Sequence, residues 1–280
     1  MGLALDPGGP RSRSPAAIAS ALLVLVALAA TACSAEHGAA GPTFQPVKPG
    51  VLTVATAFLP APGFWQGRPP TGGFEAGLAR ELANRLGLKR VALVQVPFSD
   101  IVAGKLHGAD LALSQVTPTE ERERSADFTT PYLSAPPGIL ALRRVDAADV
   151  KGLRGLRWVV SRLSTLTPIV MDRIRPTQDP IEVEDRAAAL KVLRSGRADA
   201  LMLDLPVALG LARAEPGRFH VIGQLDGDQG LAAVLPEGSR NVEIVDSEIR
   251  SLQADGTIDD LAKRWLGESE GDVPLIVTEQ

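Results

Sequence analysis

The sequence contains few of the residues that build metal centres and covalent active sites. Its 280 residues include one cysteine, Cys33, and three scattered histidines, so no metal-ligand spacing appears. No nucleophile–histidine–acid set and no phosphate-binding loop can be assembled from the motifs present. We therefore expect no metal site and no cofactor.

Aromatic residues are also scarce, and the basic residues do not outnumber the acidic ones. The net charge is −4, aromatic residues make up 4% of the chain, and no basic stripe is present, which argues against a nucleic-acid partner. The remaining composition, 45% hydrophobic and 22% charged, is typical of a soluble globular protein. A length of 280 residues suggests two lobes of ordinary size.

The longest apolar run is too short for a comfortable membrane span. It covers residues 16–30 and follows Arg11 and Arg13, which is the layout of a secretory signal peptide. The run ends in Leu28-Ala-Ala-Thr-Ala-Cys33, which resembles the lipobox of bacterial lipoproteins, although Ala30 stands where leucine is usual. In a lipobox the cysteine is acylated and becomes the first residue of the mature protein.

We therefore expect a lipoprotein signal peptide over residues 1–32, lipidation of Cys33 and a flexible Ala/Gly/Pro-rich tether over 33–50. This predicts an extracytoplasmic protein that is anchored by lipid to the bacterial cell membrane. The alternative is simple cleavage after Ala32, which would release a secreted protein whose cysteine is there by chance.

Beyond residue 50, apolar strands alternate with amphipathic helices. Leu78, Leu82 and Leu86, for example, recur at the helical spacing before Gly87 stops the pattern. This alternation predicts an α/β fold with mostly parallel sheets, whose ligands bind beyond the carboxyl ends of strands. Strands are expected at 51–55, 91–96, 111–113, 138–142, 158–161, 200–203 and 229–234, and helices at 74–86, 101–106, 185–193, 242–252 and 257–266.

One of these strand ends is rich in hydrogen-bond donors. It presents Gln115, Thr117 and Thr119, and Pro118 sits where a helix can begin, with Arg122 about one turn later. The planar fork of an arginine, nearby hydroxyls and the free amides of a helix N-terminus can together hold a carboxylate. The alternative is an ordinary capped turn with a solvated arginine.

Two later strand ends also carry polar residues. Ser164 and Thr165 follow the strand at 158–161, where one hydroxyl can cap a helix and the other is left over. Asp204 follows the strand at 200–203 and can either cap the next helix or face a cleft and hold an ammonium group.

The Pro/Gly-rich loop after the first strand carries three aromatic residues, Phe58, Phe64 and Trp65. Aromatic residues on such a loop either pack on the core or offer a face to a ligand.

Taken in order, these motifs resemble the family 3 extracellular solute-binding proteins, the amino-acid-binding components of bacterial ABC importers. The resemblance covers nearly all of residues 50–267. It rests on Gly73-Phe-Glu-Ala-Gly-Leu-Ala79, Leu106-His-Gly-Ala-Asp-Leu111, Thr117-Pro-Thr-Glu-Glu-Arg122, Asp127-Phe-Thr-Thr-Pro-Tyr132, Gly196-Arg-Ala-Asp-Ala200 and Asp255-Gly-Thr257 to Trp265.

The resemblance implies a two-lobed periplasmic-binding-protein type II fold that closes on its ligand. The two hinge strands would cross near Gly138–Leu142 and Gln229–Val234, and the C-terminal helices would return to the first lobe. The implied boundaries are 51–138 plus 234–267 for the first lobe, 143–228 for the second and 268–280 for a C-terminal tail.

The resemblance also implies how a small amino acid would be held before an ABC permease in the membrane receives it. Arg122 matches the residue that grips the α-carboxylate, with Thr117 and Gln115 beside it. Asp204 matches the acid that receives the α-ammonium. The hydroxyl pair Ser164 and Thr165 would contribute from the second lobe, and one of Phe58, Phe64 and Trp65 would form an aromatic wall.

Three positions depart from the family pattern. Gly77 replaces an aspartate on the first helix, Ala57 replaces the acid that often engages amine-bearing ligands, and Leu163 replaces a glycine. These changes argue against a lysine- or arginine-like ligand. The rival functions are a periplasmic dehydratase, for which Glu75, Glu120 and Glu121 are candidate acids that otherwise read as solvated helix faces, and a ligand sensor that does not transport.

Overall fold

The computed structural model describes residues 43–67, 70–267 and 273–278, and the account below concerns the compact unit Phe44–Gln280. The expected signal peptide, Cys33 and most of the expected tether lie outside the described residues. Within the unit, two β-sheets each carry their own helices, and we call them the first and second lobes.

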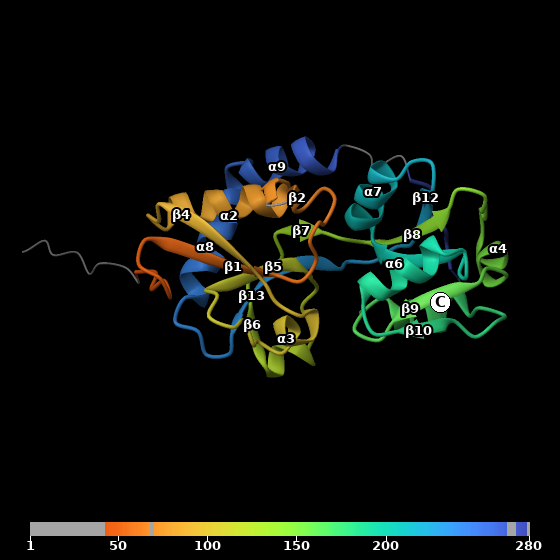
Figure 1. Ribbon diagram of the computed structural model, residues 1–280, viewed down its shortest axis with the longest axis horizontal. Coiled ribbons are helices and arrows are strands. Elements are labelled where there is room, and N and C mark those ends of the chain that lie inside the picture. Colours follow the sequence, from red (N-terminus) through yellow and green to blue (C-terminus); the bar gives the residue numbers. More distant parts are fainter. Residues whose placement is uncertain (1–42, 68–69, 268–272, 279–280) are drawn as a thin grey trace, which may run out of the picture. The chain divides into compact units, whose positions relative to one another are not determined.

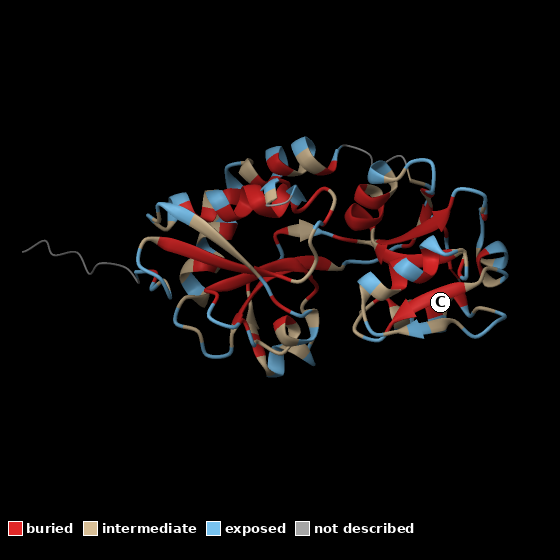
Figure 2. Ribbon diagram, viewed as in Figure 1, coloured by how far each residue is buried: buried red, intermediate tan, exposed pale blue. Residues whose placement is uncertain are grey.

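The sheet of the first lobe has the strand order β4-β1-β5-β13-β6, with β7 also paired to β13. β1 is parallel to β4 and β5, whereas β13 is antiparallel to its neighbours. Its central strands are buried along their whole length (Figure 2), which fits their nearly continuous apolar sequences. The strands are β1 (Val51–Thr56), β4 (Arg90–Gln95), β5 (Leu111–Val116), β6 (Ala126–Phe128), β7 (Leu133–Ser134) and β13 (Gly230–Pro236).

The helices of the first lobe come from both ends of the described chain. They are α2 (Phe74–Arg85), α3 (Phe98–Val102), α8 (Val242–Ala254) and α9 (Thr257–Leu266), with a small hairpin of β2 (Gln66–Gly67) and β3 (Pro70–Gly72) before α2. α2 packs against α8 and α9 (Figure 1), as the resemblance implied for the C-terminal helices. A Cβ atom on Gly77 would lie 2.6 Å from Cδ2 of Leu261, so the glycine permits the close approach of α2 and α9.

The sheet of the second lobe has the order β10-β9-β11-β8-β12, with β8 antiparallel to β11 and β12. α6 and α7 pack on its strands. The elements are β8 (Pro137–Leu142), α4 (Val150–Arg154), β9 (Trp158–Ser161), α5 (Thr167–Ile169), the π-helical turn η2 (Val170–Ile174), β10 (Ile181–Val183), α6 (Arg186–Arg194), β11 (Ala200–Asp204), α7 (Leu205–Ala214) and β12 (Phe219–Gln224).

The chain passes between the lobes at residues 135–136 and 225–229 instead of at the two segments expected from the sequence. Gly138–Leu142 lies inside β8, in the second sheet, and Gln229–Val234 falls almost entirely in β13 of the first. Both are buried apolar strands with a partner on each side, so they form the sheets themselves. The connections fall on Ala135-Pro136 and on the polar Asp226-Gly-Asp228.

The described part of the expected C-terminal tail packs on the second lobe. Leu275 forms a parallel bridge with Gln224 of β12, and the amide of Ile276 donates to the carbonyl of Gln224 over 2.8 Å. Ile276 is buried in the apolar core of that lobe. The tail therefore adds to the second lobe after the chain has completed the first.

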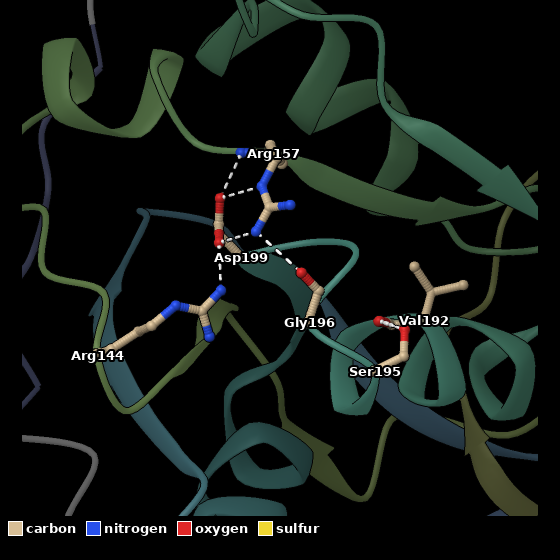
Figure 3. A network of polar contacts seen from close by, with 6 residues as sticks. All are labelled: Arg144, Arg157, Val192, Ser195, Gly196 and Asp199. Carbon is tan, nitrogen blue, oxygen red and sulfur yellow. Dashed lines mark hydrogen bonds and ion pairs between the residues drawn. The ribbon is translucent and has the colours of Figure 1, made fainter.

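An arginine–aspartate network fixes the turn that starts β11 (Figure 3). Arg157 donates from Nε and Nη2 to the two carboxylate oxygens of Asp199 over 2.8 and 2.7 Å, and Arg144 adds a bond of 3.1 Å. Nη2 of Arg157 also donates to the carbonyl of Gly196 over 2.9 Å. The hydrogen bonds from Arg157 lower the pKa of Asp199. This network anchors the strand whose far end carries Asp204.

Candidate binding site between the strand ends

Residues from both lobes line one cavity of about 60 Å³ at the ends of β5, β9 and β11. At about 10–15 Å³ for each water-sized group, such a cavity suits a small ligand. Its described lining consists of Phe58, Phe98, Gln115, Thr117 and Arg122 from the first lobe, and Ser161, Leu163, Ser164, Thr165, Leu166, Arg186, Leu201, Met202, Leu203 and Asp204 from the second.

Gln115 is held in an unusual backbone conformation near the end of β5. Its φ is 50°, in the left-handed region that a non-glycine residue rarely adopts. The backbone amide donates to Oε1 of Glu75 over 2.9 Å, and the side-chain amide donates to Oε2 of the same carboxylate. Glu75 therefore fixes Gln115 with two bonds, and the side-chain oxygen Oε1 of Gln115 accepts from Arg186 in the second lobe.

Arg122 connects the two lobes at the cavity. Its Nη1 donates to the carbonyl of Thr117 over 2.6 Å, and its Nη2 donates to the carbonyl of Leu163 in the second lobe over 2.8 Å. The guanidinium lies 5.6 Å from the ring centre of Phe98. Desolvation lowers the pKa of Arg122, an effect that Asp204 and then Glu121 oppose.

The helix expected to begin at Pro118 does not form. Residues 117–119 are irregular and are followed by a single 3₁₀ turn, η1 (Arg122–Arg124). Oγ1 of Thr119 accepts a bond from the amide of Arg122, the first residue of this turn, over 3.2 Å. The expected cluster of free helix amides is therefore a wrong prediction, and the donors at this strand end come from side chains.

Ser164 and Thr165, which follow β9, form different contacts. Oγ of Ser164 accepts from the amide of Leu166 over 3.2 Å, which is a local turn contact. Thr165 makes a longer contact of 3.4 Å with Oε1 of Gln229, in the segment that joins the lobes. Both residues line the cavity.

Asp204 ends β11 and stands at the N-cap position of α7, yet its side chain forms no capping bond with any described residue. Its Oδ1 atom is buried and has no hydrogen-bond partner within the described chain. Desolvation raises the pKa of Asp204 to about 6, although Arg186 and Arg122 oppose the shift. Of the two alternatives that the sequence left open, the structure therefore favours a carboxylate that faces the cavity.

Arg186 is the main cavity residue that the sequence analysis missed. It is the first residue of α6, its Nη2 donates to Oε1 of Gln115 over 2.7 Å, and its guanidinium lies 3.8 Å from the ring centre of Phe58. Desolvation lowers its pKa to about 10, against the attraction of Asp204, Glu75 and Asp185. A cation in the first turn of a helix is unfavourable for the helix dipole, and this unusual position is what could have identified Arg186 from the sequence.

A sequence model of the bacterial extracellular solute-binding proteins, family 3, matches residues 57–268. The chain belongs to this family. The expected fold is also confirmed, because the structure is similar to the solved structure of an ancestral arginine-binding protein bound to glutamine, a type II periplasmic binding protein. The TM-score is 0.67 at 26% identity, covering 79% of this chain and 100% of that one.

Curated relatives of this solute-binding protein are amino-acid-binding proteins. It is 28% identical over 212 residues to the L-cystine-binding protein TcyJ of Escherichia coli (strain K12), covering 70% of this chain and 74% of the relative. It is 25% identical over 201 residues to the ABC transporter glutamine-binding protein GlnH of Bacillus subtilis (strain 168), covering 70% of this chain and 73% of the relative.

Two of the three candidate aromatic residues of this solute-binding protein lie in its core. Phe64 is fully buried and packs edge-on against Phe74, with ring centres 6.0 Å apart. Trp65 is also buried, and its Nε1 donates to the carbonyl of Leu113 over 3.2 Å. Among the described lining residues of the cavity, the aromatic members are Phe58 and Phe98, and the sequence analysis did not single out Phe98.

Glu75 was read as part of a solvated helix face, and that interpretation is wrong. Its exposed fraction is 0%, and besides Gln115 it accepts a bond of 2.6 Å from the hydroxyl of Tyr132. Burial raises its pKa, which the donors of Tyr132 and Gln115 counteract. Glu75 supports Gln115 from behind and is absent from the described lining of the cavity. Glu120 and Glu121 are exposed.

Within residues 43–67, 70–267 and 273–278, no group of three or more His, Cys, Asp and Glu side chains could hold a metal ion. Across the same residues, no helix combines the length and apolar character needed to cross a membrane.

Proposed function

We propose that this solute-binding protein captures a small amino acid between its two lobes and delivers it to an ABC permease. The observation that carries the proposal is that Arg122 from one lobe and Asp204 from the other line the same cavity. Asp204 has a buried oxygen without a partner in the described chain. A buried polar atom of this kind is costly unless something donates to it, and the α-ammonium of an amino acid would do so.

In the proposed complex, the α-carboxylate lies against the remaining donors of Arg122 and beside Thr117. The α-ammonium lies against Asp204 and the hydroxyls of Ser164 and Thr165. Each lobe supplies one half of the ion-pair set, so the ligand stabilises the arrangement in which the lobes meet. Curated relatives that bind cystine and glutamine support an amino acid as the class of ligand.

The pKa shifts support the same arrangement. Desolvation lowers the pKa of Arg122 and raises that of Asp204 to about 6, so each side chain is short of charge compensation. A zwitterion would supply an anion to the first and a cation to the second. Burying such an ion pair stabilises the complex when every charge has a partner, which predicts large losses when one partner is removed.

The experiment is calorimetry of the purified protein, after a thermal-shift screen of the standard amino acids has found a ligand. Arg122→Ala should weaken its binding by about 2–5 kcal/mol, because the ligand carboxylate would be buried without its partner. Arg124→Ala is a matched control, since Arg124 is an exposed arginine on the same short turn. Affinity of Arg122→Ala within twofold of the unchanged protein would rule the proposal out.

We also propose that acylation of Cys33 anchors the protein outside the cytoplasm, as the lipobox-like motif indicates. Cys33→Ser should move the protein from the membrane fraction to the soluble fraction of expressing cells. Retention of the variant in the membrane fraction, with its leader cleaved, would contradict lipid anchoring through Cys33.

A second candidate function follows from Asp204. A cavity carboxylate whose pKa is about 6 is suited to general acid–base catalysis, which a dehydratase requires. Incubation with pooled metabolites separates the two functions: a binding protein is stabilised against heat and leaves its ligand unchanged, whereas an enzyme converts it.

A further inference from the structure

Arg186 gives the cavity a second cation that the proposed amino-acid contacts do not use. The described lining contains two guanidinium groups, Arg122 and Arg186, and one carboxylate, Asp204. A zwitterion would pair its carboxylate with Arg122 and its ammonium with Asp204. The charge of Arg186 would then face the ligand without an anion of its own.

The neighbours of Arg186 do not neutralise it by direct contact. Within the described chain, neither Arg186 nor Arg122 forms an ion pair within 4.0 Å of a carboxylate. Arg186 instead donates a hydrogen bond to the neutral side chain of Gln115. Glu75 lies behind Gln115, where Gln115 and Tyr132 occupy its oxygens.

The orientation of Arg186 is fixed. Its guanidinium is stacked on Phe58 at 3.8 Å, which sets the plane of the group, and the bond to Gln115 sets its rotation. One guanidinium has five N–H donors, so donors remain for a carboxylate in the same plane. A fixed, planar and incompletely paired cation is suited to recognising a second acidic group of the ligand.

We propose that the ligand is an acidic amino acid, whose side-chain carboxylate binds Arg186 while its α-carboxylate binds Arg122. A cavity volume of about 60 Å³, room for about four to six water-sized groups, favours an amino acid with a short side chain. Desolvation lowers the pKa of Arg186 to about 10 even though Asp204, Glu75 and Asp185 attract its charge, so the buried cation has room for a further anion. This inference rests on the proposed function, since it assumes that Arg122 and Asp204 hold the α-groups.

The main alternative is that the side chain extends elsewhere. A neighbouring cavity of about 440 Å³ shares Phe58, Gln115 and Arg186 with this one, and much of its remaining lining is apolar, including Leu190 and Val207. An amino acid with a long apolar side chain would use that space and would leave Arg186 unpaired.

Calorimetry with matched ligands tests the proposal on the full chain in mild detergent. The probes are L-aspartate, L-asparagine, L-glutamate, L-glutamine and L-leucine, because each acid differs from its amide mainly in charge. We expect at least one acid to bind about tenfold or more tightly than its own amide and more tightly than leucine. An amide or leucine that binds best to the unchanged protein would overturn the proposal.

Substitutions then assign the preference to one side chain. Arg186→Met should weaken binding of the acid by about 100-fold and change binding of the amide by less than about threefold, so that the preference disappears. Arg186→Lys should keep part of it. Arg162→Met is the control for loss of a nearby positive charge, because Arg162 is exposed and pairs with Glu184 at 3.4 Å; it should leave the preference unchanged.

The outcomes separate this inference from the proposed function. If Arg122→Ala weakens binding of acid and amide alike, but the unchanged protein binds both equally, the amino-acid function stands and the role of Arg186 is wrong. A preference for the acid that survives in Arg186→Met also overturns that role. If none of the five probes binds, the inference about Arg186 fails, whereas the amino-acid function fails only if the screen of the standard amino acids also finds no ligand. Should Arg186→Met not fold, the comparison of acid with amide in the unchanged protein still decides.

Discussion

Glu75 and Asp204 are both buried acidic side chains, and they differ in what surrounds them. Glu75 accepts bonds from the backbone and side chain of Gln115 and from the hydroxyl of Tyr132. Asp204 has a buried oxygen without a partner among the described residues, although it occupies a position where a capping bond is common. Burial raises the pKa of both carboxylates, but only for Glu75 do several hydrogen bonds from side chains oppose the shift.

The difference shows that one residue type can stabilise the fold in one place and, as we propose, bind a ligand in another. A carboxylate that is fully hydrogen-bonded holds its neighbours rigidly and has little left to offer a ligand. One that is desolvated and incompletely paired makes the protein less stable and makes the site more attractive to a cation. Glu75 therefore fixes Gln115 on the first lobe's side of the cavity. Asp204 gives the second lobe's side a carboxylate that is incompletely hydrogen-bonded.

Removing Glu75 should have the largest effect on stability. Glu75→Ala would leave the donors of Gln115 and Tyr132 buried without an acceptor and would open a cavity, so we expect a loss of about 3–5 kcal/mol in the free energy of unfolding. Urea unfolding followed by circular dichroism measures it. Glu81→Ala, a half-buried position on the same helix, is the control and should cost much less. A loss below about 1 kcal/mol would show that the network around Glu75 is not structural.

Asp204→Asn should change the free energy of unfolding in the opposite direction, by stabilising the ligand-free protein. The pKa of Asp204 is about 6 in the folded protein, against an ordinary value of 3.8, so the folded state binds its proton more tightly than the unfolded state between these values. Asp204 therefore destabilises the folded protein most above pH 6, where it is ionised, and least below pH 4. Neutralising it should stabilise the ligand-free protein at pH 7 by up to about 3 kcal/mol.

The measurement for Asp204→Asn is the free energy of unfolding at pH 4 and at pH 7. The gain should be large at pH 7 and small at pH 4, and the variant should bind the ligand weakly. A variant that is less stable than the unchanged protein at pH 7 would contradict the interpretation of Asp204 as a carboxylate without sufficient partners.

The elements of the fold could be predicted because their patterns are local. The strand at Trp158–Ser161 and the helix at Thr257–Leu266 have the expected bounds, since apolar runs and helical spacing decide them. β5 was expected to stop at Leu113 and continues to Val116. Two of the three added residues, Ser114 and Gln115, are polar but buried, and Gln115 adopts a positive φ that a propensity argument does not anticipate.

The site was predicted in part, and the omissions are long-range contacts. Arg186 contacts Gln115 across 71 positions in the sequence, and Glu75 accepts from Tyr132 across 57. No local pattern encodes such a contact. An acid in the first turn of a helix is ordinarily solvated and stabilises the helix dipole, so the burial of Glu75 depends on tertiary packing that sequence spacing does not reveal.

Asp204 should also make ligand binding depend on pH. Binding of an α-ammonium requires the ionised carboxylate, so lowering the pH from 7 to 5 should weaken binding by about tenfold for a pKa of about 6. Calorimetry in two buffers with different ionisation enthalpies should detect proton release on binding near pH 5.5. Both effects should be absent in Asp204→Asn. An affinity that is constant from pH 5 to pH 7 would place the ammonium away from Asp204.

Thr165→Val should have the smallest effect, because it removes a neutral hydroxyl and keeps the shape of the side chain. The contact of Thr165 with Gln229 is long, at 3.4 Å, so the free energy of unfolding should change by less than about 0.5 kcal/mol. Ligand affinity should fall by about two- to tenfold, the range of one neutral hydrogen bond. Calorimetry of Thr165→Val and Asp204→Asn with the same ligand compares the two losses of affinity directly. A loss at Thr165 equal to that at Asp204 would mean that the hydroxyl groups, and not the carboxylate of Asp204, dominate recognition by the second lobe.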